Sequence, residues 1–132
     1  GKITVFGVEA KRARDAVLYV PQHCTLFETS IRENLELLAG VPFAQVLEYA
    51  ELTGLTRVIG SLPMREETQI SAQGQNLSSG QRQLVVLTAA FASGRPVLLL
   101  DEATSQVDVV ARSRIDWERL ASDRTIVRVE HG

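Results

Sequence analysis

The sequence predicts an α/β fold in which a helical segment, from about residue 30 to residue 93, is inserted between strands of one sheet. Two observations carry this prediction. The elements run in the order two strands, several helices, a buried strand, a helix and a last strand. In addition, Val97–Leu100 is an uninterrupted apolar run, which is typical of a central parallel strand covered on both faces. The 132 residues suffice for one small domain.

Two short strands are predicted at the beginning, over Ile3–Phe6 and Leu18–Val20. Pro21 ends the second strand because proline has no N–H to donate to a sheet ladder. The first helix is expected to begin at Ser30 as N-cap, with Glu33 at the capping-box spacing, and to stop at Gly40.

The period of the apolar residues predicts a second helix over Phe43–Leu52, which Gly54 closes. The helix over Gly80–Phe91 is apolar nearly all round beyond its first turn, which indicates burial. The remaining elements are a helical turn over Thr56–Ser61, a loop over Met64–Asn76, a helix over Val109–Leu120 and a strand over Thr125–Val129.

Composition excludes several classes of protein. The formal net charge of −2 gives no indication of binding to nucleic acid or to an acidic membrane surface. The single cysteine, Cys24, cannot form an internal disulfide, and with His23 it lacks the second ligand pair of a zinc site. No apolar run reaches the roughly 18–20 residues that span a bilayer, and the first residues show no signal-peptide pattern.

An acid pair, Asp101 and Glu102, follows the apolar strand, at the place where open α/β sheets bind ligands. An Asp there can hold Mg²⁺, and an adjacent Glu can deprotonate an attacking water. A solvated strand end explains the pair equally well. Residues Asn76–Gln81 lead into the buried helix, and their serines and glycine suit an anion site at a helix N-terminus. An ordinary helix cap is the alternative.

Taken together, these motifs resemble the ATP-binding-cassette (ABC) family. Leu77–Gln83 looks like the family's signature motif and Val97–Ser105 like its Walker B strand with the catalytic Glu. The other matching stretches are Tyr19–His23 (Q-loop), Ser105–Asp108 (D-loop), His131 (switch histidine), Leu26–Asn34 and Glu67–Ile70. The last two resemble the exporter branch, of the bacteriocin-peptide-export type. The resemblance covers essentially the whole chain.

The resemblance implies a partial P-loop NTPase-like sheet core with an inserted helical subdomain, residues 1–132 forming part of one nucleotide-binding domain. It implies ATP and Mg²⁺ as cofactors, with Asp101 and Gln22 at the metal, Gln22 also positioning water, Glu102 as general base and His131 on the γ-phosphate. The implied contacts to ATP held by a second such domain, stacked head to tail, are Ser78, Ser79, Gly80, Gln81 and Asp108.

A transmembrane domain is the other implied partner, at the cytoplasmic face of the cell membrane. Leu26 and Phe27, which follow the Q-loop, are either core residues or part of the surface that docks on it. Trp117 lies on a charged helix and is predicted to pack inside the domain or to face a partner. No nucleic-acid partner is expected.

The sequence departs from the family pattern in several places. It contains no Gly-x-x-x-x-Gly-Lys-Ser/Thr loop, so we expect a partial domain that does not hydrolyse ATP alone. Ser79 replaces a usual glycine, and Arg128 and Glu130 put charge on a strand that is normally apolar. A non-catalytic pseudo-domain that only pairs with a partner therefore remains an alternative. A DNA-associated ABC ATPase is disfavoured because the chain has no heptad run and no basic patch.

Overall fold

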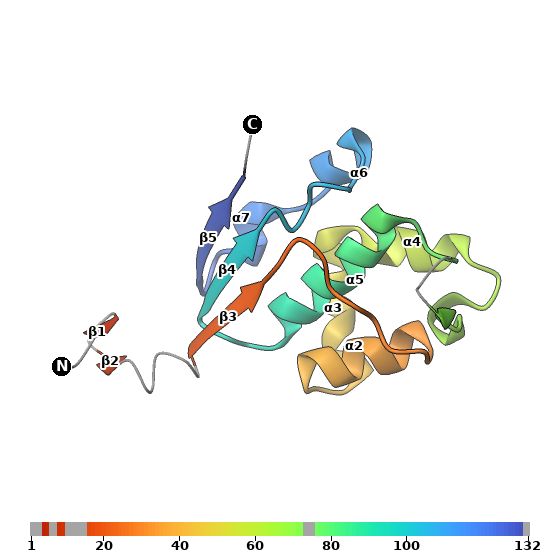
Figure 1. The fold of residues 1–132 in the computed structure, drawn as a ribbon, viewed down its shortest axis with the longest axis horizontal. Coiled ribbons are helices and arrows are strands. Elements are labelled where there is room, and N and C mark those ends of the chain that lie inside the picture. The colour runs from red at the N-terminus through yellow and green to blue at the C-terminus, as the bar shows by residue number, and fades with distance from the viewer. Residues whose placement is uncertain (1–3, 6–7, 10–15, 73–75, 131–132) are drawn as a thin grey trace.

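A parallel three-stranded sheet organises the chain. The computed structural model describes residues 4–5, 8–9, 16–72 and 76–130. The strands of this sheet are β3 (Val17–Val20), β4 (Val97–Asp101) and β5 (Thr125–Val129), in the order β3-β4-β5. The central strand β4 pairs in parallel with both neighbours (Figure 1). The predicted α/β class is confirmed, and the predicted strand ends are each within one residue of those observed.

The first strand prediction is only partly confirmed. Thr4–Val5 forms β1, which pairs antiparallel with β2 (Val8–Glu9) in a two-stranded ladder. The sequence did not predict β2. The outer residues of the predicted strand, Ile3 and Phe6, lie outside the described residues.

The inserted segment between β3 and β4 is helical, as predicted. Its elements are α2 (Ile31–Ala39), α3 (Phe43–Thr53), α4 (Leu55–Ser61), the 3₁₀ turn η1 (Arg65–Glu67) and α5 (Ser79–Ala92). Helices α2, α3 and α4 all pack against α5 (Figure 1). The short turn η1 lies inside the segment predicted as loop.

Local capping explains where α2 begins and ends. The Ser30 hydroxyl accepts a hydrogen bond from the Glu33 backbone N–H at 3.0 Å, as an N-cap does. The predicted capping box is only half formed, because the Glu33 carboxylate accepts from the Thr29 hydroxyl at 2.7 Å. Gly40 ends the helix in the left-handed conformation (φ 73°), which glycine adopts without a steric penalty.

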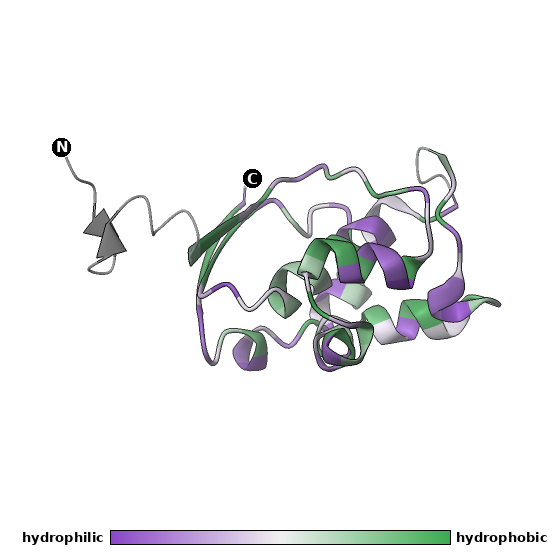
Figure 2. Cartoon of the chain, turned by 90° about the horizontal axis from the view of Figure 1, so that it is seen from below, coloured by the Kyte–Doolittle hydropathy of each residue, from purple (hydrophilic) through white to green (hydrophobic). Residues whose placement is uncertain are grey.

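Helix α5 is the centre of the core. Its side chains Leu87 and Phe91 are fully buried, which confirms the predicted burial. The hydroxyls of Thr53 on α3 and Thr88 on α5 are 2.6 Å apart, and neither residue is exposed. Figure 2 shows the strands of the sheet coloured as hydrophobic, and the helices with alternating hydrophobic and hydrophilic stretches. The helices are thus held by apolar packing plus one buried polar link.

The single helix predicted over Val109–Leu120 is wrong. The structure has two short helices, α6 (Val109–Ser113) and α7 (Trp117–Leu120). They are separated because Asp116 donates its backbone N–H to the Leu52 carbonyl at 2.8 Å and caps α7 with its side chain. A long-range contact has overridden the local helical pattern.

Trp117 packs inside the chain. Its ring meets Phe91 edge-on at a centroid distance of 6.2 Å. The Trp117 ring also contacts Arg128, whose guanidinium lies over it at 4.0 Å from the ring centroid. The same guanidinium pairs with the Glu130 carboxylate. The charge that the sequence places on β5 is therefore matched by partners in this chain, and the packing role of Trp117 is confirmed.

Arg124, just before β5, connects the sheet to the helices. Its guanidinium donates to the Phe91 carbonyl at 2.6 Å and lies over the Tyr49 ring at 5.4 Å.

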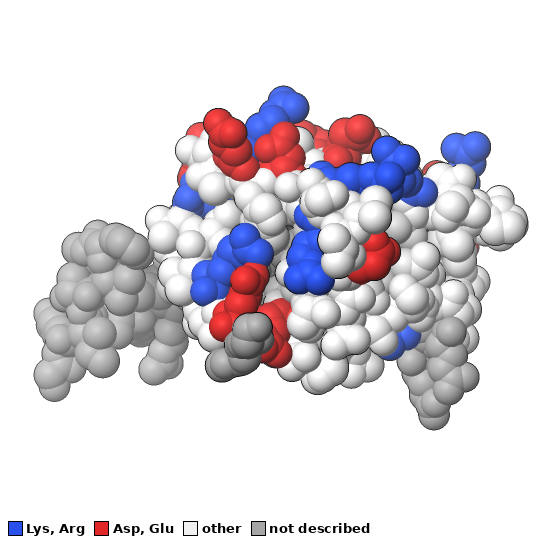
Figure 3. Space-filling view, turned by 90° about the horizontal axis from the view of Figure 1, so that it is seen from above, with Lys and Arg blue, Asp and Glu red and all other residues white. Residues whose placement is uncertain are grey.

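On the face seen in Figure 3, positive and negative side chains lie side by side. In the part of the chain that the structure describes, no helix combines the length and the apolar character needed to cross a bilayer.

Candidate functional site

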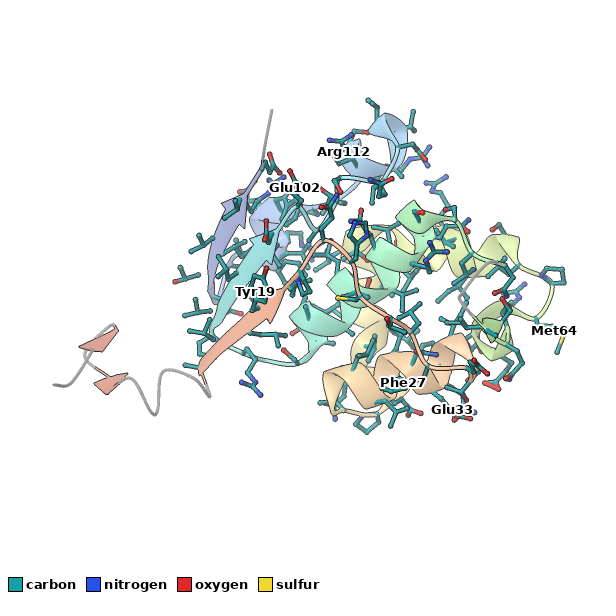
Figure 4. The ribbon with its side chains drawn as sticks, in the orientation of Figure 1. Tyr19, Phe27, Glu33, Met64, Glu102 and Arg112 are labelled. Atoms are coloured by element: carbon teal, nitrogen blue, oxygen red, sulfur yellow. The ribbon has the colours of Figure 1, made fainter. Side chains whose placement is uncertain are left out.

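The acid pair stands at the carboxyl end of β4, where the prediction placed it. Asp101 is the last residue of the strand, and Glu102 follows in the left-handed region at φ 53°. The Glu102 backbone N–H donates to the Val129 carbonyl at 2.8 Å, so the neighbouring strand holds this turn. A non-glycine residue in that region costs about 1–3 kcal/mol and persists only where its surroundings enforce it. The turn directs the chain away from the sheet edge at the point where chemistry is expected (Figure 4).

Tyr19, on the adjacent strand β3, contacts the acid pair. Its hydroxyl donates to Oδ2 of Asp101 at 2.9 Å, and this hydrogen bond is the main cause of a raised pKa of the tyrosine. The bond fixes the orientation of the Asp101 carboxylate. Tyr19 was not among the residues predicted to be functional. The available signal was a hydroxyl-bearing residue in a short apolar strand three positions before Gln22.

Gln22 lies against the D-loop. Its side-chain nitrogen donates to the Ser105 hydroxyl at 3.2 Å. This contact joins the segment that follows β3 to the segment that follows β4, because both strands end at the same edge of the sheet. Leu26 further on is buried, whereas the Phe27 side chain is half exposed (Figure 4). The structure thus assigns Leu26 to the core and leaves Phe27 at the surface.

Gln83, on α5, connects these segments and was not predicted as a functional residue. Its side-chain nitrogen donates to the Gln22 carbonyl and the Glu102 carbonyl, each at 3.1 Å, and to the Ser105 hydroxyl at 3.3 Å. Its side-chain oxygen accepts from the Gln106 backbone N–H at 2.7 Å. One amide therefore bonds to the Q-loop, to the acid pair and to the D-loop.

The signature turn has the geometry of a helix cap. The Ser78 hydroxyl accepts from the Gln81 N–H at 3.0 Å, and the Gln81 side-chain oxygen accepts from the Ser78 N–H at 2.9 Å, a complete capping box. Arg82 donates to the Leu77 carbonyl at 2.7 Å and to the Ser79 hydroxyl at 3.1 Å. The first-turn N–H groups of a helix have no acceptor within it and carry partial positive charge, so the turn can still present them to an anion.

Gly80 is required by packing inside the chain. A Cβ at this position would lie 2.5 Å from the Gln106 carbonyl oxygen, closer than real contacts allow. The glycine therefore lets the signature helix touch the D-loop backbone. Asp108, at the end of that loop, caps α6 by accepting from the Ala111 N–H at 2.8 Å. With Gln81 it lines a hollow of about 230 Å³.

A larger cavity of about 480 Å³ is lined by residues that follow β3 and by residues at the start of α5. Gln22 and Cys24 line one side, and Ser79, Arg82 and Gln106 line the other. Burial raises the pKa of the Cys24 thiol, which makes the thiolate scarcer near neutral pH. His131, the expected γ-phosphate ligand, lies outside the described residues.

The donor set at the strand edge fits magnesium. Asp101 and Gln22 offer oxygen ligands, which this hard cation prefers. Among the described residues, no group of three or more His, Cys, Asp or Glu side chains is placed to hold a metal ion. One carboxylate plus an amide oxygen matches an ion that keeps several waters and takes its other ligands from substrate phosphates.

The fold and the site define an α/β protein with an acid pair at the carboxyl edge of its sheet and a capped helix beside it. Residues 1–105 match the family model of ABC transporters, and the chain belongs to that family. It is 33% identical over 133 residues to the transport/processing ATP-binding protein ComA of Streptococcus pneumoniae (strain ATCC BAA-255 / R6), covering 99% of this chain and 18% of ComA.

Other relatives are similar to the same extent. The lactococcin transport/processing ATP-binding protein LcnC-like of Lactococcus lactis subsp. lactis (strain IL1403) is 32% identical, with 99% of this chain and 19% of that protein covered. The solved structure of a bacterial Atm1-family ABC exporter with ATP bound superposes with a TM-score of 0.88 at 29% identity, covering 99% of this chain and 24% of that one. The chain thus spans about a fifth of the length of these two curated relatives, which are exporter-type ABC proteins.

Proposed function

We propose that this chain is part of the ATPase domain of an ABC exporter, and that the complete domain couples ATP hydrolysis to transport. One observation carries the proposal: Gln22, the acid pair and the signature helix converge on the carboxyl edge of β4 through the contacts of Gln83. Residues from about 30 to 93 form the helical subdomain of that domain. The strained backbone of Glu102, which the Val129 carbonyl holds, supports a role for this residue beyond binding.

The reaction follows from the groups at the edge. Glu102 accepts a proton from a water whose oxygen attacks the γ-phosphorus, while the bond from that phosphorus to the bridging oxygen of ADP breaks. Asp101 and the Gln22 side-chain oxygen would hold magnesium, which when bound neutralises charge on the phosphates. Gln22 also positions the water, and His131 would donate a hydrogen bond to the γ-phosphate. The Tyr19 hydroxyl donates to Oδ2 of Asp101 and would help to orient that carboxylate.

The signature residues would serve a second site. In our proposal Ser78, Ser79, Gly80 and Gln81 contact ATP held by a second nucleotide-binding domain, stacked head to tail. Because the Ser78 and Gln81 side-chain oxygens each accept from the other residue's backbone N–H, the remaining backbone N–H groups of the first turn supply much of the attraction for phosphate. Asp108 lies beside Gln81 and links the two sites across the interface.

The membrane partner would meet the helical side of the chain. Phe27 is half exposed, and its backbone is fixed by Asn34, whose side chain accepts from the Phe27 N–H at 2.8 Å and donates to its carbonyl at 3.0 Å. An apolar ring on a fixed loop suits docking on a transmembrane domain at the cytoplasmic face of the membrane.

The proposal is tested by removing the proposed general base, Glu102. The chain is joined to the phosphate-binding-loop segment of a related ATP-binding protein such as ComA, and the ATPase rate is measured with and without Glu102→Gln. We expect kcat to fall by about 10²–10⁴-fold, the usual contribution of general-base catalysis, with ATP binding retained in calorimetry. The matched control is Glu48→Gln on the exposed side of α3, which should leave the rate unchanged. A Glu102→Gln protein as active as its parent would refute the proposal.

A non-catalytic pairing module is the second candidate, because the 132 residues contain no Gly-x-x-x-x-Gly-Lys-Ser/Thr loop. We expect the chain alone not to hydrolyse ATP under either proposal. The joined protein separates the two: binding of Mg-ATP without turnover favours the pairing module, whereas turnover that depends on Glu102 favours the ATPase.

A further inference from the structure

The buried side chain of Gln83 makes hydrogen bonds to the loops that follow β3 and β4. It is 8% exposed, and its amide makes bonds to residues on both sides of it in the sequence, from Gln22 to Gln106. Its orientation is set by chemistry: a flipped amide would turn its oxygen toward two carbonyls and its NH₂ toward an N–H. All of its partners belong to the segments proposed to act on ATP, and none is an ordinary core contact.

A second contact couples the same helix to the same loop. One turn before Gln83, the Gly80 backbone rests against the Gln106 carbonyl, and Gln83 accepts from the N–H of that same residue. The N-terminal part of α5 therefore contacts Gln106 at two points, through Gly80 and through Gln83. A shift of the signature turn has to move Gln106, and through the Gln83 NH₂ it also acts on the carbonyls of Gln22 and Glu102.

We infer that Gln83 is a positioning residue that couples the signature turn, which serves the partner domain's nucleotide, to the water-activating groups Gln22 and Glu102 of this chain's own site. The inference rests on the proposed ATPase function and deepens it, because it names how occupancy of one site regulates the other. Gln83 touches neither ATP nor water in this scheme. It acts through the backbone carbonyls of the two residues that do.

Amide exchange in the 132-residue chain tests the geometry without any nucleotide. Gln83→Leu removes every bond of the side chain at nearly constant volume, and we expect the Gln106 N–H to exchange up to about tenfold faster, the worth of one hydrogen bond. Gln83→Glu keeps an acceptor for that N–H, but its second oxygen faces the Gln22 and Glu102 carbonyls, so we expect exchange of the Gln106 N–H to rise less than in Gln83→Leu. The matched control is Gln45→Leu on the exposed side of α3. Unchanged Gln106 exchange in Gln83→Leu would overturn the inference.

The kinetic test uses the joined protein described above. Both Gln83→Leu and Gln83→Glu lose the donors to Gln22 and Glu102, so we expect kcat to fall by about 10- to 100-fold while the KM for ATP stays within about twofold. The cooperativity of ATP hydrolysis should fall as well, because the two sites are uncoupled. A purely structural role predicts lowered stability in Gln83→Leu but full kcat in a folded Gln83→Glu.

The outcomes separate the two claims. If the parent joined protein hydrolyses ATP and folded Gln83→Glu does so with the same kcat and cooperativity, the coupling role is refuted and the ATPase proposal stands. If the parent does not hydrolyse ATP, the ATPase proposal and the coupling that rests on it both fail, whatever the exchange data show. A selective loss of kcat in both Gln83 variants, with Gln45→Leu unaffected, supports the coupling.

Discussion

Substitution of Gly80 by alanine offers a sharp test of the contact between the signature helix and the D-loop. The new Cβ would lie 2.5 Å from the Gln106 carbonyl oxygen and 3.1 Å from the Val107 Cα. Both neighbours are backbone atoms, which cannot rotate away as a side chain can. Gly60 on α4 provides the matched control, because a Cβ there meets no atom within 4 Å.

The expected magnitudes follow from the two environments. Overpacking against fixed atoms costs about 1–3 kcal/mol, and the better helix propensity of alanine offsets up to about 1 kcal/mol of this. We therefore expect Gly80→Ala to lower the free energy of unfolding by about 1–2 kcal/mol. Gly60→Ala should raise it by about 0.4–1 kcal/mol, since alanine restricts the unfolded chain. The two variants should differ by about 2 kcal/mol.

Urea denaturation followed by circular dichroism measures this difference. With a slope of about 1–3 kcal/mol per molar urea, the two midpoints should be separated by roughly 1 M. Exchange of the Gln106 N–H adds a local readout, because movement of Gln106 would lengthen its 2.7 Å bond to the Gln83 side chain. Equal midpoints for Gly80→Ala and Gly60→Ala, with unchanged slopes, would refute the argument that the D-loop backbone fills the space beside Gly80.

Further predictions concern the helical segment. Thr53→Val and Thr88→Val should each cost about 0.5–1.5 kcal/mol of unfolding free energy, the net worth of the 2.6 Å bond between the two hydroxyls, because the hydroxyl that remains keeps a backbone partner. The loss of unfolding free energy in the double variant should be smaller than the sum of the two single losses by about 0.5 kcal/mol or more. A double-mutant cycle measured by urea denaturation tests this, and strictly additive losses would contradict a direct bond between the two hydroxyls. Arg32 lowers the pKa of Glu67, so the stabilisation from this pair is present above the usual glutamate pKa and is lost as the pH falls through the lowered value. The urea midpoints of wild type and Glu67→Gln should therefore differ at pH 7 and converge toward pH 3, whereas a constant difference would exclude the pair as its source.

Features that depend on interactions between neighbouring residues, such as helix ends, could be predicted from the sequence. Ser30, Gly40 and Gly54 mark helix ends because a hydroxyl or a left-handed glycine acts on its own neighbours. The acid pair was placed correctly since a strand of apolar residues must end where polar ones begin. The break before α7 was not predicted, because the carbonyl that holds Asp116 belongs to Leu52.

The contacts that organise the candidate site were harder to predict for the same reason. Gln83 and Gln22 are 61 positions apart, and Tyr19 and Asp101 are 82 positions apart. Nothing in the local pattern around Gln83 distinguishes an amide that bonds two distant loops from one that faces solvent. The resemblance to the ABC family pointed to these segments, and the fold shows which side chains tie them together.

The parallel sheet has a consequence for how the chain reaches its native state. Strand β3 is complete after residue 20, yet its partner β4 begins at residue 97, after the whole helical segment. Closing so long a loop costs little equilibrium stability, since the entropy grows only with the logarithm of its length. It does slow folding, because contacts between distant residues stabilise the chain only after the entropy of closing the loop has been lost. We expect the helices around α5 to form within their own segment first, with the edges of β3 and β4 open to other chains until the sheet closes.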